Sequence, residues 1–249
     1  MRITFLGTGA GFPTKDRHCA SCLIEIGERL YLIDAGVPVT DIFAEKEKSI
    51  ENIRGVFLSH FHLDHSAGCI QLMDLAMNYY RKSKFVLYVP EQRAIDAVKA
   101  VIAASGAKNE SDRVGYAVYD ENFVFDDGTL KLVPIRTHHT SNNPASGINS
   151  FAYYIEAEGK RLLFTNDLSM YHEANDFPKI VNEGHFDLVV SECGHITVEN
   201  LVDSVKDADI GILAVTHVGI REHYEKLEKI KNQFAFEMII TKDDDYIEL

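Results

Sequence analysis

Short apolar runs separated by turns recur along the chain and predict most of its strands. The runs lie at 3–6, 22–26, 30–33, 56–58, 85–89, 130–135, 151–155, 161–164 and 210–216. Several alternate apolar with polar residues, and others are continuously apolar, as is typical of half-buried and fully buried strands. The dipeptide Glu158-Gly159 between two of these runs predicts a hairpin.

Helices are predicted where apolar positions recur every three or four residues. The segments are 67–80, 91–104 and 221–232. In the first of them, Ile70, Met73, Met77 and Tyr80 are expected to be core contacts. Strands in two groups, with helices between and after them, indicate the α/β class.

Length and composition indicate one globular domain over residues 1–249. Nothing in the 249 residues resembles a linker, and 46% hydrophobic with 25% charged residues is ordinary for a folded protein. These values disfavour disorder and a membrane protein. Residues 1–6 look like a strand and lack the features of a secretory signal, so a cytoplasmic location is expected.

Charge and cysteine usage bear on possible partners. With 38 acidic and 25 basic residues the formal net charge is −13, which opposes binding of polyanions. A small-molecule substrate is therefore expected, and nucleic acid is an unlikely partner. Cys19 and Cys22 are spaced as a redox or structural zinc pair, but no second such pair exists, and small thiols entering a strand are the favoured interpretation.

Segment 59–65 carries the strongest chemical signal of the chain. It places His60, His62, Asp64 and His65 directly after an apolar run. In an extended segment alternate side chains share a face, so His60 and His62 can converge on one ion, while Asp64 and His65 follow as a helix begins. A solvated histidine-rich loop would not require this alternation, and the segment is interpreted as a metal motif.

The motif His-x-His-x-Asp-His resembles the signature of the metallo-β-lactamase superfamily of hydrolases. The resemblance implies a four-layer αββα sandwich with the metal site at one edge of the sheets. It also implies three further ligands, in the order His, Asp, His, each at the end of a strand. His139, Asp167 and His217 fill these places, with His138 as the alternative to His139.

The branch of the superfamily is indicated by the glycine-rich stretch 6–14, which resembles the opening of ribonuclease Z-like and related phosphodiesterase members. Its three glycines are expected to allow positive φ values and a close approach to an anion or to the metals. Segment 191–195 resembles the region that holds a supporting acid and a catalytic histidine in the family, so His195 is a candidate. Loop 141–147 either lines the substrate entrance or is a plain surface loop.

The resemblance implies a binuclear hydrolase, with a hydroxide made available by two divalent ions as nucleophile. Zinc suits the nitrogen-rich first site, and manganese or iron is an alternative. The predicted activity is a phosphodiesterase acting on a small phosphoester, with Asp64 orienting the water and His195 protonating the leaving oxygen. A lactonase or thioesterase of the glyoxalase II type and a ribonuclease Z-like nuclease remain as alternatives, and a homodimer is possible.

Overall fold

The computed structural model describes residues 1–139, 149–169 and 176–249. The predicted loop 141–147 lies outside the described residues. The chain divides into two compact units, one made of residues 1–119 with 243–248 and the other of residues 120–242 with Leu249. The expectation of a single domain stays a prediction. No helix among the described residues is long and apolar enough to cross a bilayer.

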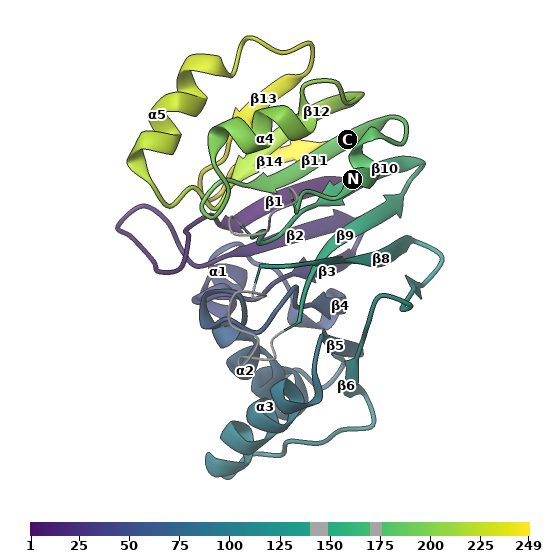
Figure 1. The fold of residues 1–249 in the computed structure, drawn as a ribbon. Coiled ribbons are helices and arrows are strands. Elements are labelled where there is room, and N and C mark those ends of the chain that lie inside the picture. Colours follow the sequence, from purple (N-terminus) through teal and green to yellow (C-terminus); the bar gives the residue numbers. More distant parts are fainter. Residues whose placement is uncertain (140–148, 170–175) are drawn as a thin grey trace. The chain divides into compact units, whose positions relative to one another are not determined.

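The first unit is built on a seven-stranded sheet with the order β14-β1-β2-β3-β4-β5-β6 (Figure 1). The strands are β1 (Arg2–Gly7), β2 (Ser21–Ile26), β3 (Arg29–Ile33), β4 (Ile53–Phe57), β5 (Phe85–Val89), β6 (Val114–Val118) and β14 (Tyr246–Glu248). Strands β14 to β3 pair antiparallel, and β3 to β6 pair parallel. Parallel pairing requires crossover connections, which the helices of this unit supply.

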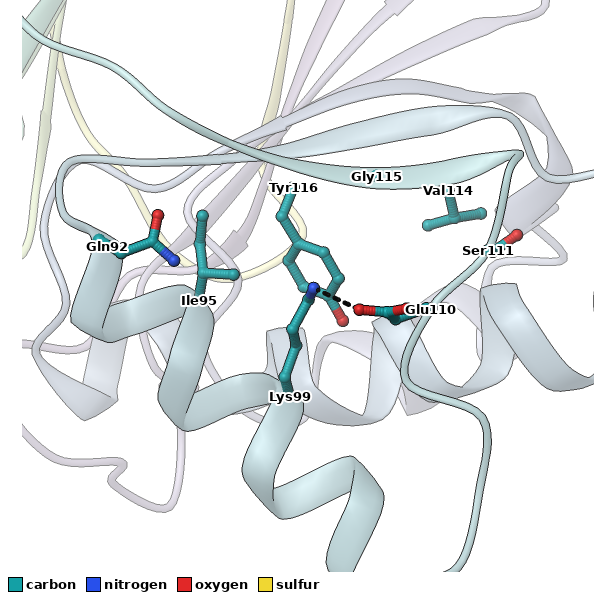
Figure 2. Close-up of a pocket in the computed structure, with 8 residues that line it drawn as sticks. All are labelled: Gln92, Ile95, Lys99, Glu110, Ser111, Val114, Gly115 and Tyr116. Atoms are coloured by element: carbon teal, nitrogen blue, oxygen red, sulfur yellow. Dashed lines mark hydrogen bonds and ion pairs between the residues drawn. The ribbon is translucent and has the colours of Figure 1, made fainter.

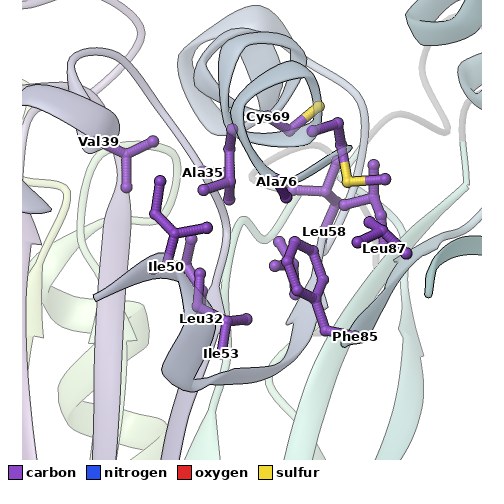
Figure 3. Packing of buried hydrophobic residues seen from close by; sticks show 14 of the residues in the cluster. Leu32, Ala35, Val39, Ile50, Ile53, Leu58, Cys69, Ala76, Phe85 and Leu87 are labelled. Atoms are coloured by element: carbon purple, nitrogen blue, oxygen red, sulfur yellow. The ribbon is translucent and has the colours of Figure 1, made fainter. Parts of the chain in front are cut away.

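Three helices pack on one face of this sheet. They are α1 (Val39–Glu45), α2 (Leu63–Asn78) and α3 (Gln92–Ala104), and a short 3-10 turn, η1 (Ile50–Asn52), precedes β4. Figure 3 shows Leu32 of β3, Leu58 directly after β4 and Leu87 of β5 in one apolar cluster with helical residues such as Ala76. Burial of these side chains anchors both ends of the loop that carries the histidine motif.

The second unit has its own seven-stranded sheet, with the order β13-β12-β11-β10-β9-β8-β7. The strands are β7 (Phe125–Asp126), β8 (Leu130–Thr137), β9 (Ser150–Ala157), β10 (Lys160–Phe164), β11 (Phe186–Glu192), β12 (Ile210–Thr216) and β13 (Glu237–Ile240). The predicted hairpin is confirmed, since Glu158 and Gly159 both have positive φ and join β9 to β10.

Helices α4 (Val198–Val205) and α5 (Arg221–Ile230) belong to this unit, together with the 3-10 turn η2 (Lys179–Asn182). Their apolar residues Leu201 and Leu227 pack in one cluster with Val189 of β11 and Leu213 of β12. Thr197 caps α4 by accepting a hydrogen bond from the Asn200 amide. The helices thus hold the parallel strands whose ends carry the candidate ligands.

The helix predicted over 67–80 begins earlier and ends earlier than expected. Helix α2 already starts at Leu63, so Asp64 and His65 lie in its first turn, where a carboxylate is favoured by the helix dipole. It ends at Asn78, and the amides of Tyr79 and Tyr80 both donate to the Leu75 carbonyl. Tyr80, predicted as a core contact, is therefore beyond the helix and 39% exposed.

Each unit gathers its polar candidates at one edge of its sheet. Because β3 and β4 are parallel, the residues that follow them emerge at the same edge. Strands β10, β11 and β12 are likewise parallel, and β8 has the same direction as β10 since both pair antiparallel with β9. Carboxyl ends of such strands are the usual position of ligand sites in α/β sheets.

Candidate metal centre

The histidines of the motif converge on one another in the first unit. His60 follows β4 and is fully buried. Its Nε2 atom lies 2.9 Å from Nδ1 of His62, and its Nδ1 atom lies 3.0 Å from the hydroxyl of Ser59. The serine therefore engages the ring nitrogen that points away from His62. This leaves His60 Nε2 and His62 Nδ1 as the two nitrogens that can share an ion.

Asp64 and His65 form a second pair of donors at the start of α2. Asp64 Oδ2 lies 3.3 Å from Nε2 of His65 and accepts a hydrogen bond of 3.0 Å from the Gly11 amide. Gly11 has a φ of 73°, which favours glycine, whereas Gly7 is needed because a Cβ there would collide with the Cys19 carbonyl. Of the three glycines expected to adopt positive φ, Gly7, Gly9 and Gly11, only Gly11 does so.

Asp34 is a supporting acid that the sequence interpretation missed. It follows β3, is 4% exposed, and accepts a hydrogen bond of 2.7 Å from Nδ1 of His65. The same carboxylate accepts from the amide and the hydroxyl of Ser59, at 2.7 and 2.9 Å. A carboxylate on Nδ1 fixes the histidine tautomer and presents Nε2 as a ligand. The sequence signal that could have identified Asp34 is its position as an acidic residue directly after an apolar strand.

Three candidate histidines converge around the carboxylate of Asp167 in the second unit. Nε2 of His139 and Nδ1 of His195 lie 3.5 and 3.6 Å from Asp167 Oδ2, and Nε2 of His217 lies 3.5 Å from Oδ1. The donor atoms of His139, Asp167 and His195 all lie within 4.8 Å of one another. The rings of His139 and His195 meet edge to face with centroids 4.5 Å apart.

The two neighbouring histidines after β8 have different surroundings. His139 directs Nδ1 at the Leu168 carbonyl, 3.2 Å away, so its Nε2 is the nitrogen near Asp167. His138 lies against Asp176 instead, with Nδ1 at 2.7 Å from the carboxylate, which also accepts from the His138 amide. This geometry favours His139 over His138 as the ligand.

Glu192 holds the loops of the second cluster together. It ends β11, is 1% exposed, and accepts hydrogen bonds from the amides of Leu168, Gly194 and His195. Leu168, whose amide donates to Glu192, directly follows Asp167, so one buried carboxylate fixes both the Asp167 loop and the His195 loop.

His217 has a left-handed backbone conformation, with a φ of 51°.

The donor set fits divalent ions. Two atoms bound to one zinc ion at about 2.05 Å with tetrahedral angles lie about 3.4 Å apart. The histidine–carboxylate distances of 3.3, 3.5, 3.5 and 3.6 Å are close to this value and longer than good hydrogen bonds. Imidazole nitrogens and carboxylate oxygens suit zinc, manganese and iron.

The cysteines do not take part in such a cluster within the described residues. Every group of potential ligand atoms found there consists of histidines and aspartates. Cys19 and Cys22 are both buried, and burial raises the pKa of each thiol. This agrees with the interpretation of buried structural thiols, since a raised pKa disfavours the thiolate that metal binding needs.

A family model described as anti-Pycsar protein Apyc1 matches residues 1–207 of the chain. The chain belongs to this family. Among curated proteins, ribonuclease Z from Methanosarcina acetivorans is 21% identical over 98% of the chain and 96% of that protein. Ribonuclease Z from Methanosarcina mazei is 31% identical over 36% of the chain, and the match spans only 30% of that relative.

Solved structures with the same fold cover the whole of this Apyc1-family chain. The metallo-β-lactamase fold protein YhfI from Bacillus subtilis has a TM-score of 0.77 at 20% identity, with 98% of that chain covered. Human short-form tRNase Z has a TM-score of 0.75 at 18% sequence identity, with 99% of that chain covered. Zinc-bound PqqB from Methylobacterium extorquens has a TM-score of 0.74 at 18% sequence identity, with the whole of that chain covered.

These likenesses confirm the metallo-β-lactamase fold and the ribonuclease Z-like branch predicted from the sequence, and they support binding of divalent metal. They give no support to the prediction that nucleic acid is an unlikely partner, because relatives of this Apyc1-family member are named ribonuclease Z. That prediction rested on the summed charge, which says nothing about charge at one place on a surface.

Replacing Asp34 with Asn should weaken metal binding by about 10- to 100-fold, because the neutral amide no longer fixes His65 and Ser59 with a full negative charge. Competition with a chromophoric chelator measures the affinity. The matched control is Asp41→Asn, at an exposed position in the first turn of α1. Equal metal affinity in the Asp34 and Asp41 variants would contradict a supporting role for Asp34.

Proposed function

We propose that this protein is a metal-dependent phosphodiesterase that hydrolyses a small phosphoester. The observation that carries the proposal is the pair of histidine–aspartate clusters, each at the carboxyl-terminal edge of its sheet and each with the spacing of metal ligands. The ribonuclease Z relatives support phosphodiester chemistry over other reactions of the fold.

The proposed metal ligands are seven residues, His60, His62, Asp64, His65, His139, Asp167 and His217. They would hold two divalent ions, and a set of five imidazoles and two carboxylates favours zinc. Bound ions of this kind lower the pKa of water toward neutrality and neutralise the non-bridging oxygens of a phosphate group. Asp34 and Glu192 would orient the donors of their own clusters.

Two side chains are proposed to act on protons. One carboxylate oxygen of Asp64 is fixed by the Gly11 amide and His65. Asp64 can therefore orient the attacking water or accept a proton from it. The side chain of His195 is 35% exposed, with Nδ1 near Asp167 and Glu192. The other ring nitrogen, Nε2, can donate a proton to the leaving oxygen of the substrate.

A ribonuclease Z-like nuclease is the second candidate. A ribonuclease Z relative that aligns with 98% of this chain, and over 96% of its own length, favours this candidate. A lactonase or thioesterase of the glyoxalase II type would use the same donors to attack a carbonyl carbon, and substrate assays distinguish it.

The decisive experiment combines metal analysis with a substrate panel. Protein purified without added metal is assayed for zinc, manganese and iron. It is then tested on bis(p-nitrophenyl) phosphate, a cyclic nucleotide, a precursor transfer RNA, a lactone and a thioester. We expect about two metal ions per chain and turnover of the small phosphodiesters.

The pattern of rates decides between the candidates. Faster cleavage of the precursor RNA than of any small diester would favour the nuclease. Hydrolysis of the lactone or the thioester alone would contradict phosphodiester chemistry. A metal-loaded protein inactive on the whole panel would contradict the proposal.

A further inference from the structure

A hollow in the surface of the first unit has the chemistry of an anion site. It has a volume of about 400 Å³ and is lined by Met77 and Asn78 at the end of α2, by Arg81, and by Lys108 and residues 110–113. Its lining includes three cationic residues, Arg81, Lys108 and Arg113, and two acidic residues, Glu110 and Asp112. The chain as a whole has a net charge of −13, so this local excess of cations is unusual for the protein.

The cations of this hollow lack the ion pairs that basic residues form elsewhere. Across the described residues many lysines and arginines contact a carboxylate, for example in the pairs Arg2–Glu248, Lys48–Glu25, Lys160–Asp187 and Lys226–Glu199. No such pair is formed by Arg81, Lys108 or Arg113 within the part of the chain that the structure describes. Uncompensated cations around one hollow attract an anionic ligand.

One of the two carboxylates is already engaged by a cation outside the hollow. Figure 2 shows the adjoining hollow, where Nζ of Lys99 lies 3.1 Å from Glu110 and 5.3 Å from the centre of the Tyr116 ring. With Glu110 neutralised by Lys99, Asp112 is the remaining negative charge facing three positive ones. The hollow therefore keeps a positive balance.

Hydrogen bonds fix the walls of this hollow before any ligand arrives. Asn78 donates to the Lys108 carbonyl and accepts from its amide, at 3.0 and 3.2 Å. The guanidinium of Arg113 donates to the carbonyls of Ser83 and Met77, at 2.9 and 3.4 Å. A guanidinium held in this way keeps further N–H groups for a planar or tetrahedral oxyanion, and prior ordering lowers the entropic cost of binding.

The hollow is separate from the histidine motif. Residues 81–84 precede β5 and residues 108–113 precede β6, so both lie at the amino-terminal ends of these parallel strands. The motif follows the carboxyl end of β4, which is parallel to β5. The two edges are about 17 Å apart, because each strand has five residues.

We propose that this hollow binds a phosphomonoester of a small molecule, about the size of a mononucleotide. Its volume exceeds that of a single phosphate ion, and arginine forks match the oxygens of a terminal phosphate dianion. The inference goes beyond the proposed function and does not depend on it.

The test is a titration of the metal-loaded, ¹⁵N-labelled protein with inorganic phosphate, with a 5′-mononucleotide and with an octauridylate that has hydroxyl groups at both ends. We expect saturable shifts of amide signals in residues 77–84 and 108–113 with the mononucleotide, and weaker ones with inorganic phosphate. The double variant Arg81→Gln/Lys108→Gln should lower the affinity by about tenfold or more.

The control is Lys179→Gln/Lys229→Gln, which removes the same charge from exposed positions of the second unit. It should leave the affinity at the hollow unchanged. Shifts confined to the histidine motif, or equal affinity in both double variants, would overturn the proposal. Equal shifts with the hydroxyl-ended octauridylate would overturn the assignment to a phosphomonoester and indicate a nucleic-acid backbone instead.

Discussion

Replacing Asp167 with Ala is expected to abolish turnover, with kcat/KM lower by about a thousandfold or more. One of its oxygens lies 3.5 Å from Nε2 of His139, and the other lies 3.5 Å from Nε2 of His217. Removing the carboxylate therefore removes the group that lies close to both of these nitrogens. Loss of a metal ligand removes several kcal/mol of electrostatic stabilisation in the transition state. Metal content per chain should fall in the same variant.

The measurement pairs steady-state kinetics on a small phosphodiester with metal analysis of the same sample. Asp207→Ala, at an exposed position beyond α4, is the matched control and should retain activity and metal. Circular dichroism verifies that the Asp167 variant is folded. A folded Asp167 variant with full activity would refute both the ligand assignment and the proposed function.

The ends of strands were the part of the site that the sequence could predict. Asp167 and His217 each follow an apolar run, and a run of that kind has few alternatives to a buried strand. Polar residues at the carboxyl ends of parallel strands then meet at one edge without any knowledge of side-chain contacts. The order of strands in the two sheets required the structure, because local pattern does not specify which strands pair.

Other features depended on contacts that are remote in sequence. Asp34 is 31 positions from His65, and nothing in the local pattern indicates that the two are joined by a hydrogen bond. Apolar periodicity placed the start of α2 at residue 67, because the first turn carries the polar residues of the motif, although the motif itself indicated that a helix begins at Asp64 and His65. Helices α1 and α4 have seven and eight residues, which gives a helical period too few turns to stand out.

Total charge was the least informative quantity. The net charge of −13 suggested that polyanions are excluded, yet Arg81, Lys108 and Arg113 line one hollow. At physiological ionic strength a charge is screened over about 8 Å, so a ligand at a surface responds to the nearest groups and not to the sum. Placement of cations therefore has to be known before a class of partner is excluded.

The two adjacent histidines after β8 should respond to mutation in opposite ways. His139→Ala removes a nitrogen 3.5 Å from Asp167, and we expect kcat/KM to fall by about 100-fold or more together with metal content. His138→Ala removes the side-chain partner of Asp176, a residue only 9% exposed, while the amide of residue 138 still donates to it. Its expected cost is stability, about 1–3 kcal/mol, with metal content retained.

Melting temperature, metal content and kinetics, measured on the two variants and on the exposed-site control His185→Ala, distinguish these effects. A cost of 1–3 kcal/mol corresponds to a lower melting temperature by several degrees in a chain of this size. If His138→Ala lost metal while His139→Ala kept it, the ligand would be His138. That result would mean that Asp176, and not the Leu168 carbonyl, orients the metal-binding imidazole after β8.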